Sequence, residues 1–448
     1  MQYLGYALFA LPFALAVPLA LGLCLLILGL YSNAAVGLWL VLFTFLYETA
    51  VIIMPGLHLG LTLYPQDFVF VAIGFATALR LLGGRQLTRI PWMLVLLYGV
   101  MAFSFVLGLA RFGATAGVQF REEFYFWVGA AYFLSFPVIG NKLSGFARAW
   151  IVTALTILLI VYYRWLADAL GLDLVEPLWH HAMDSQGSGL RVVNSAQALV
   201  LGQALILIVY AMAAGSGLRK WRFLVPFLIV TILVLQHRSV WIATFVPILL
   251  SFLLLKKGKD RLFTNLAVVT LAAGAVLAPI LVGGGGQAVT SAITVSAERA
   301  TNLSAGTTGD RIEGWKELLG QWAHAGPLVN AVGSPYGSGF DRYSAKGDLV
   351  TYAPHNYYVQ MLLRTGLTGL LALLAIYWYG LRWLRRDENF SHPDVPAAAL
   401  VALLISQLLY YIPYSVGYTQ GAILGIALAL VRDRIVGWHS PAVVEEEV

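Results

Sequence analysis

Two arginines in mostly apolar surroundings could bind an anion. Arg238 lies in LVLQHRSVWIATF, between two apolar runs. An arginine at membrane depth is costly, so it normally extends to the lipid headgroups or faces a polar cavity where it can bind an anion. Arg311 lies in TTGDRIEGWKELLGQW, where Asp310 and Glu313 have the spacing of a helix capping box. In the first turn of that amphipathic helix, Arg311 either lies on a solvated face or joins free backbone N–H groups in binding an anion.

A histidine lies where the chain is expected to re-enter the membrane. His355 and Asn356 occur in TYAPHNYYVQ, directly before an apolar run. A histidine is neutral or charged near pH 7, so it can accept a proton from a hydroxyl; the alternative is a structural hydrogen bond. Nearby arginines should lower its pKa from about 6.5. Asn356 would orient the histidine or the substrate.

Other chemistries lack their motifs in this chain. There is no HExxH, CxxC, P-loop or EF-hand pattern. His180 and His181 are adjacent, so they do not share a helix face, and no third ligand is evident. The turn GSPYGSGFDRY, residues 333–343, suits exposed N–H groups but lacks the Lys-Ser/Thr of a phosphate loop. We therefore predict no metal and no cofactor, with arginines binding any diphosphate.

One further arginine has a local explanation. Arg164 in VYYRWLADAL is followed four residues later by Asp168. This spacing places the two side chains on one face of a helix, where they can form an ion pair. A structural pair is therefore favoured over a ligand site at Arg164.

The composition identifies the elements that must position these residues. The 448-residue chain is 60% hydrophobic and 11% charged, whereas a soluble domain carries roughly 25% charged residues. A soluble enzyme, a disordered protein and a disulfide scaffold are excluded, the last also because Cys24 is the single cysteine. The net charge of +6 reports membrane topology rather than nucleic acid. The fold class is thus an all-α polytopic membrane protein, a bundle of about 12–14 transmembrane helices.

The apolar runs divide the chain into four parts. Residues 1–282 should hold the N-terminal transmembrane helices, 283–355 a large periplasmic loop with short amphipathic helices, 356–431 the C-terminal transmembrane helices, and 432–448 a cytoplasmic tail. The first run, 3–31, is too long for one span, and two short helices folded back on each other would fit it. It starts without Lys or Arg, which favours a retained membrane segment over a cleaved signal peptide. Most basic residues lie on alternate loops, which the positive-inside rule makes cytoplasmic together with both termini.

These motifs, taken together, resemble a known family. His355-Asn356, followed after nine residues by Gly366-Leu-Thr-Gly369, resembles the signature of the bacterial O-antigen ligase and polymerase superfamily. Three supporting features are the Arg238-Ser239 pair that opens a helix, the Arg311-x-x-x-Trp315 helix, and the glycine-rich turn before the histidine. The segment GLRVVNSAQAL, which contains Arg191, also resembles a family segment. One departure is His237, where a small residue is expected; it could be a second titratable group.

The resemblance implies both the reaction and the roles of these residues. Such enzymes are inverting, metal-independent glycosyltransferases of the bacterial inner (cytoplasmic) membrane. They move a glycan from undecaprenyl diphosphate to an acceptor hydroxyl at the periplasmic face. On this chain His355 matches the general base, and Arg238 and Arg311 match the arginines that bind the diphosphate. Arg191 matches a further substrate-binding arginine, and Asn356 is assigned to substrate binding beside the histidine.

Three functions remain open. The first is ligation of O-antigen to lipid A-core, which would make the partners a lipid-linked glycan donor, lipid A-core and membrane lipids. The second is polymerisation of repeat units, in which the acceptor is another lipid-linked glycan. A lipid or polysaccharide transporter is the alternative of a different class, but it predicts inverted repeats and broken helices near the midplane, which the sequence lacks.

Overall fold

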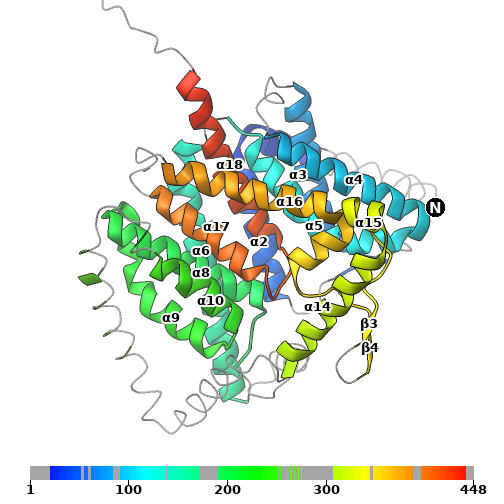
Figure 1. Cartoon of the computed structure of the whole chain (residues 1–448). Coiled ribbons are helices and arrows are strands. Elements are labelled where there is room, and N and C mark those ends of the chain that lie inside the picture. The colour runs from blue at the N-terminus through cyan, green and yellow to red at the C-terminus, as the bar shows by residue number, and fades with distance from the viewer. Residues whose placement is uncertain are drawn as a thin grey trace, which may run out of the picture.

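The computed structural model in Figure 1 describes most of the chain, and all structural statements below refer to the described residues. These are residues 21–51, 55–58, 62–83, 91–137, 139–171, 190–250, a few single positions between 253 and 274, 306–343, 347–386 and 395–439. The first part of the apolar run 3–31, most of residues 251–282, His180 and His181, the loop start at 283–305 and the end of the tail at 440–448 lie outside them.

The described chain is almost entirely helical, which confirms the all-α polytopic class. Its α-helices are α2 (Ala34–Ala50), α3 (Pro65–Gly83), α4 (Trp92–Phe112), α5 (Ala114–Leu134), α6 (Leu143–Ala169), α8 (Ser195–Ala214), α9 (Val225–Val234), α10 (Arg238–Leu249), α14 (Gly306–His324), α15 (Pro327–Val332), α16 (Tyr357–Arg386), α17 (Ala397–Tyr410) and α18 (Tyr418–His439). Two antiparallel hairpins pair β1 (Leu57–His58) with β2 (Thr62–Leu63) and β3 (Arg342–Tyr343) with β4 (Leu349–Val350). Two 3₁₀ segments are Gly140–Lys142 and Gly217–Leu224.

Five described helices are long and apolar enough to cross a membrane: α3, α4, α6, α8 and α16. A sixth span is possible if Leu21–Ser32 and α2, which meet at a bend of 116°, are counted as one. Helices α10 and α17 are shorter and apolar. The described residues therefore confirm a multi-pass membrane protein, while the total of 12–14 spans stays a prediction. Helix α18 continues to His439, beyond the boundary at 431 that the sequence suggested.

Helix α8 lies at the centre of one half of the bundle. It is apolar on every side and 94% of its membrane-spanning window is buried, as expected for a helix surrounded by others. In Figure 1, α8, α9 and α10 form a green group, and α16, α17 and α18 separate it from α3, α4 and α5. Small residues allow the helices to approach closely: a Cβ at Gly421 of α18 would lie 2.1 Å from the Phe126 carbonyl oxygen of α5. This packing fixes the turn between α17 and α18 against α5.

The glycine-rich turn at 333–340 is packed into the bundle. Tyr336 is fully buried, and a Cβ at Gly108 of α4 would lie 2.3 Å from the Tyr336 carbonyl oxygen. The Gly337 N–H donates to the Gln119 side chain at 2.7 Å. The sequence suggested a turn with exposed N–H groups for an anion, and that interpretation is wrong because α4 and α5 cover the turn.

Helix α16 holds this turn through a buried arginine and a kink. Arg364 is 1% exposed, donates to Pro335 O, Ser338 Oγ and Gly339 O, and lies 4.0 Å over the Phe340 ring. Two residues later, Gly366 has φ 62° and interrupts the helix where α15 packs. A Cβ at Gly366 would lie 2.3 Å from the Ala331 carbonyl. The first glycine of the predicted signature is therefore a packing residue.

Candidate functional site

Helix α14 fixes the segment that carries His355. The Trp315 indole N–H donates to the Pro354 carbonyl at 2.6 Å, and Leu318, one turn later, is 2% exposed. The Glu317 carboxylate accepts the backbone N–H of Tyr343 at 2.7 Å, which attaches β3 to the same helix. The apolar stripe of α14 thus packs on the 340–355 segment. The opposite face is solvated, as shown by the exposed Lys316–Glu313 pair at 2.7 Å.

His355 lies half-buried at the start of α16. Its backbone has φ 49°, an uncommon conformation for a residue with a side chain. Its ring centroid lies 5.4 Å from that of Tyr352. Burial, together with smaller effects of the positive charges of Arg311 and Arg342, lowers the pKa of His355 to about 4. The predicted downward shift is found, but burial contributes more than the arginines do. His355 is therefore neutral at pH 7 and has a lone pair that can accept a proton.

Arg342 is a site residue that the sequence reasoning missed. It is 7% exposed and donates to Tyr352 O at 2.7 Å and Phe340 O at 3.0 Å. A Cβ at Gly314 of α14 would lie only 2.8 Å from Arg342 Nε, so that glycine makes room for the guanidinium. In the sequence, Arg342 lies in the predicted periplasmic loop with other basic residues, and no spacing separates it from them.

Arg311 faces the bundle. Its Nη1 donates to the Pro413 carbonyl at 3.2 Å, and its guanidinium carbon lies 5.4 Å from the Tyr414 ring centroid. Both partners belong to the turn between α17 and α18. Arg311 is half-exposed, so part of the guanidinium remains accessible to a ligand. Because α14 begins at Gly306, Arg311 lies in its second turn and not in the predicted first turn with free N–H groups, and these contacts hold part of its side chain against the bundle.

Arg191 and Arg238 meet at one carbonyl group. Arg191 Nη2 donates to Gln236 O at 3.1 Å, and the Arg238 backbone N–H donates to the same oxygen at 3.1 Å. Gln236 has φ 55°, which turns its carbonyl toward both residues. Both arginines are half-exposed. The two segments that the sequence singled out separately are therefore adjacent.

His237 has a structural contact. Its Nε2 lies 2.9 Å from the Val193 carbonyl, and the residue is 8% exposed. Burial lowers the pKa of His237 to about 4, with a smaller effect in the same direction from Arg191. The ring is therefore neutral, with its Nε2–H donating to Val193, and it joins the Arg191 segment to the start of α10.

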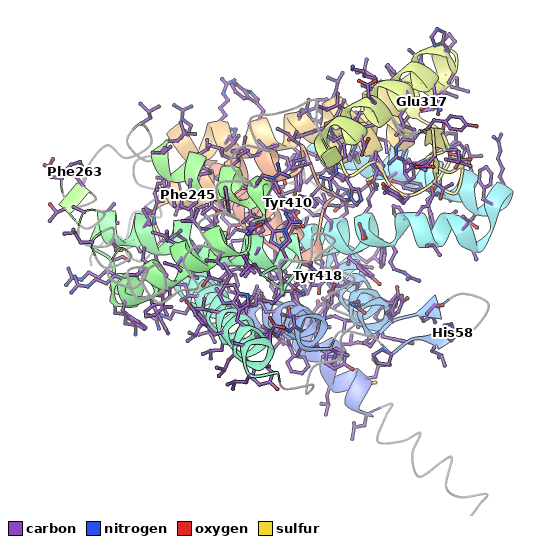
Figure 2. The ribbon with its side chains drawn as sticks, turned by 90° about the horizontal axis from the view of Figure 1, so that it is seen from below. His58, Phe245, Phe263, Glu317, Tyr410 and Tyr418 are labelled. Carbon is purple, nitrogen blue, oxygen red and sulfur yellow. The ribbon has the colours of Figure 1, made fainter. Side chains whose placement is uncertain are left out.

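A chain of contacts through Tyr410 connects the two arginine groups. The Tyr410 hydroxyl lies 2.9 Å from Ser195 Oγ, the first residue of α8, which follows the Arg191 segment. The Tyr410 ring stacks on Tyr414 with centroids 5.0 Å apart, and Tyr414 lies beside Arg311. Figure 2 shows Tyr410 between the α8–α10 group and α14. We call this end of the bundle, where these residues meet, the site end.

Asn356 is a helix cap. Its side-chain oxygen accepts the Val359 N–H at 3.1 Å, and the residue is 7% exposed. Such a cap stabilises the first turn of a helix by about 1 kcal/mol. The geometry thus gives Asn356 a structural contact directly after His355, while its predicted role toward the substrate remains a prediction.

Arg164 is bound by backbone carbonyl groups and not by Asp168, its predicted partner. Its guanidinium is 3% exposed and donates to Thr49 O and Val192 O, both at 2.6 Å. Asp168 is exposed at the end of the same helix. The buried arginine therefore connects α6 with the end of α2 and with the segment that carries Arg191, and its role is structural as expected.

Comparison with known proteins gives one family. Residues 223–374 match the O-antigen ligase family, and the matched region contains Arg238, Arg311, Arg342 and His355. The fold and this match define a multi-pass membrane protein of the class that processes O-antigen glycans. Residues 223–374 are thus similar to the O-antigen ligase and polymerase superfamily, as the motifs predicted. No curated protein matches the chain.

Proposed function

We propose that the protein is a glycosyltransferase that moves a glycan from undecaprenyl diphosphate to an acceptor hydroxyl. The observation that supports this proposal is a neutral histidine that lies within reach of the positive charges of two arginines. His355 can accept a proton at pH 7, and Arg311 and Arg342 supply positive charge beside it. A base for a hydroxyl and cations for a phosphate leaving group are what glycosyl transfer from a lipid diphosphate requires.

In the proposed reaction His355 takes the proton of the acceptor hydroxyl. The acceptor oxygen forms a bond to the anomeric carbon of the donor, and the bond from that carbon to the phosphate oxygen breaks with inversion. The electron pair leaves with undecaprenyl diphosphate, whose new charge Arg311, Arg238 and Arg191 stabilise. Arginine suits this role because its planar fork pairs with two phosphate oxygens at once. The arginines take the place of a metal ion.

The site end is proposed to face the periplasm from the inner membrane. Ligation to lipid A-core is the first choice for the acceptor, and repeat-unit polymerisation is the alternative with the same donor. The two differ only in the acceptor, so one assay separates them. A transporter is less well supported, because a proton acceptor close to cationic groups suits glycosyl transfer better than translocation.

The test is transfer by purified protein in nanodiscs. Undecaprenyl-diphosphate-linked glycan is supplied with lipid A-core or with a second lipid-linked glycan, and the product is separated by gel electrophoresis. We expect product with one acceptor, unchanged by EDTA. Arg238→Lys and Arg311→Lys should lose nearly as much activity as the alanine variants, since lysine keeps the charge but not the fork. Full activity in both lysine variants, or inhibition by EDTA, would contradict the proposal.

A further inference from the structure

Two carboxylates lie at the site end opposite the arginines. Glu122 of α5 lies near the Ser415 side chain, and its charge interacts with that of Glu48, in the last turn of α2. Glu48 in turn accepts the Tyr418 hydroxyl at 2.6 Å. Glu122 is exposed and Glu48 is half-exposed. Two acidic side chains that solvent can reach thus lie close enough for their charges to interact.

These carboxylates adjoin the proposed reaction site. Ser415 lies two residues after Pro413, whose carbonyl accepts from Arg311. Tyr410, at the start of the same turn, is close enough to interact electrostatically with both Glu122 and Arg311. Tyr410 and the 411–417 turn therefore separate an arginine side from a carboxylate side. Tyr418 and Tyr410 are both labelled in Figure 2, at the two ends of this turn.

A third acceptor lies beside Glu48. Gln66, in the first turn of α3, hydrogen-bonds the Glu48 carboxylate. Gln66 is 8% exposed, and its buried side-chain oxygen has no hydrogen-bond donor among the residues that the structure describes. A buried carbonyl oxygen without a donor costs free energy, so this position favours a ligand that brings donors.

The chemistry of this set points to hydroxyl groups. Carboxylate and amide oxygens accept hydrogen bonds, and a carboxylate can accept from two neighbouring hydroxyls of a sugar ring. An anionic ligand would be repelled by Glu48 and Glu122. A metal ion is disfavoured because, within the described part of the chain, no three His, Cys, Asp or Glu residues come together as a metal site would need.

We infer that Glu122, Glu48 and Gln66 form a subsite that binds the hydroxyl groups of a sugar ring in the substrate. The inference rests on the proposed glycosyl transfer and deepens it, because it assigns the neutral part of the substrate to the carboxylate side. The arginines would then hold the diphosphate while the carboxylates orient the sugar. A sugar of the donor glycan and a sugar of the acceptor present the same chemistry.

The experiment compares Glu122→Gln and Glu48→Gln with wild type in nanodiscs. Each variant keeps the size of the side chain but removes its charge, and hydrogen bonds to charged groups contribute about 1.5–3 kcal/mol, so KM should rise about tenfold or more. A rise in KM for the donor assigns the subsite to the donor sugar, and a rise for the acceptor assigns it to the acceptor. The control is Glu313→Gln, which changes an exposed acidic residue on the solvated face of α14.

Two binding measurements keep the inference testable without turnover. Undecaprenyl diphosphate that carries no sugar should bind wild type and both variants equally, which shows that the variants are folded and the arginine side is intact. Binding of the free oligosaccharide, followed by ligand-observed NMR, should weaken in both variants and stay unchanged in Glu313→Gln. Unchanged KM values and unchanged oligosaccharide binding in both variants would overturn the subsite. Failure of the proposed function is a different result: wild type would then transfer no glycan with either acceptor.

Discussion

His355 combines a left-handed backbone with a lowered pKa. Because its pKa lies at about 4 rather than 6.5, the neutral form prevails throughout the range in which an ordinary histidine becomes protonated. The folded state binds fewer protons than the unfolded chain between these values, so this residue lowers stability as the pH falls from about 6.5 to 4. Its capacity as a base should persist over the same range.

We therefore expect kcat/KM to stay level from pH 7 through 6.5 and to fall only toward pH 4. His355→Ala should reduce transfer by about 10²–10⁴-fold, the usual effect of removing a general base. The measurement is a pH–rate profile for wild type, with donor binding to His355→Ala as the control for folding. Near-normal turnover in a well-folded His355→Ala variant, or an acid limb centred near 6.5, would contradict this role.

Gln236 is the second described residue that has a side chain and a positive φ. Its carbonyl accepts from Arg191 and from the Arg238 N–H. Gln236→Gly and Gln236→Val both remove the amide side chain, but only glycine adopts a left-handed backbone easily. We expect the glycine variant to keep donor affinity and the valine variant to raise the donor KM several-fold, as measured by initial rates. Equal KM values for the two variants would mean that this backbone conformation does not position the arginines.

At the scale of single residues, part of the site could be predicted from the sequence. Arg238 was conspicuous because charged groups are rare in apolar sequence, Arg311 because of its place in a predicted amphipathic helix, and His355 because it precedes the predicted re-entry into the membrane. Arg342 and Glu122 were not, because their importance depends on contacts between elements far apart in the chain. The tyrosine-rich segment YYIPYSVGY, residues 410–418, was a signal that could have indicated the turn beside Arg311.

At the scale of the elements, the sequence predicted helices better than it predicted burial. The apolar spacing of 310–322 correctly predicted an amphipathic helix, α14, but the predicted cap at Asp310 was wrong because the helix already begins at Gly306. The glycines of 333–340 correctly predicted a turn, but the residue types of a turn do not show whether other helices pack on it. Ser104 of α4 donates to Ser334 O at 3.2 Å, a contact across 230 residues that no local pattern contains.

The kink of α16 should depend on Gly366. Gly366→Ala would place a Cβ 2.3 Å from the Ala331 carbonyl in a backbone with φ 62°. We expect a loss of several degrees in the apparent Tm in detergent, together with lower activity, because α15 must shift. Gly320→Ala is the matched control: it lies inside α14 with nothing within 4 Å, so alanine should be neutral or slightly stabilising. An unchanged Tm for Gly366→Ala would show that the kink tolerates a side chain.

At the scale of the whole molecule, the residues proposed to take part in the reaction lie at one end of the bundle. The ends of α2 and α17 and the starts of α3, α5, α8, α10, α14, α16 and α18 lie there. Composition predicted a membrane bundle correctly because 11% charged residues cannot cover a soluble surface. The number of spans could not be fixed by hydropathy, since α10 and α17 are short and the pair Leu21–Ser32 and α2 bends by 116°.

The positive-inside pattern makes a prediction for this bundle. Reporter fusions at Gly258 and Ser304 should report opposite sides of the membrane, with the fusion at Gly258 in the cytoplasm. Alkaline phosphatase and green fluorescent protein fusions at each position measure this directly. If both positions reported the same side, the proposed periplasmic location of the site would be wrong.

The helix between Asn356 and Gly366 also sets a fixed spacing. Asn356 caps its first turn and Gly366 ends its first straight part, and ten residues of helix rise about 15 Å. One end of this segment carries His355, and the other is held against Ala331. A one-residue insertion between them would rotate the two ends by about 100° relative to each other. An insertion here should therefore be tolerated far less than a substitution. The nine-residue interval of the signature sets the distance and the orientation of the histidine relative to the packed kink.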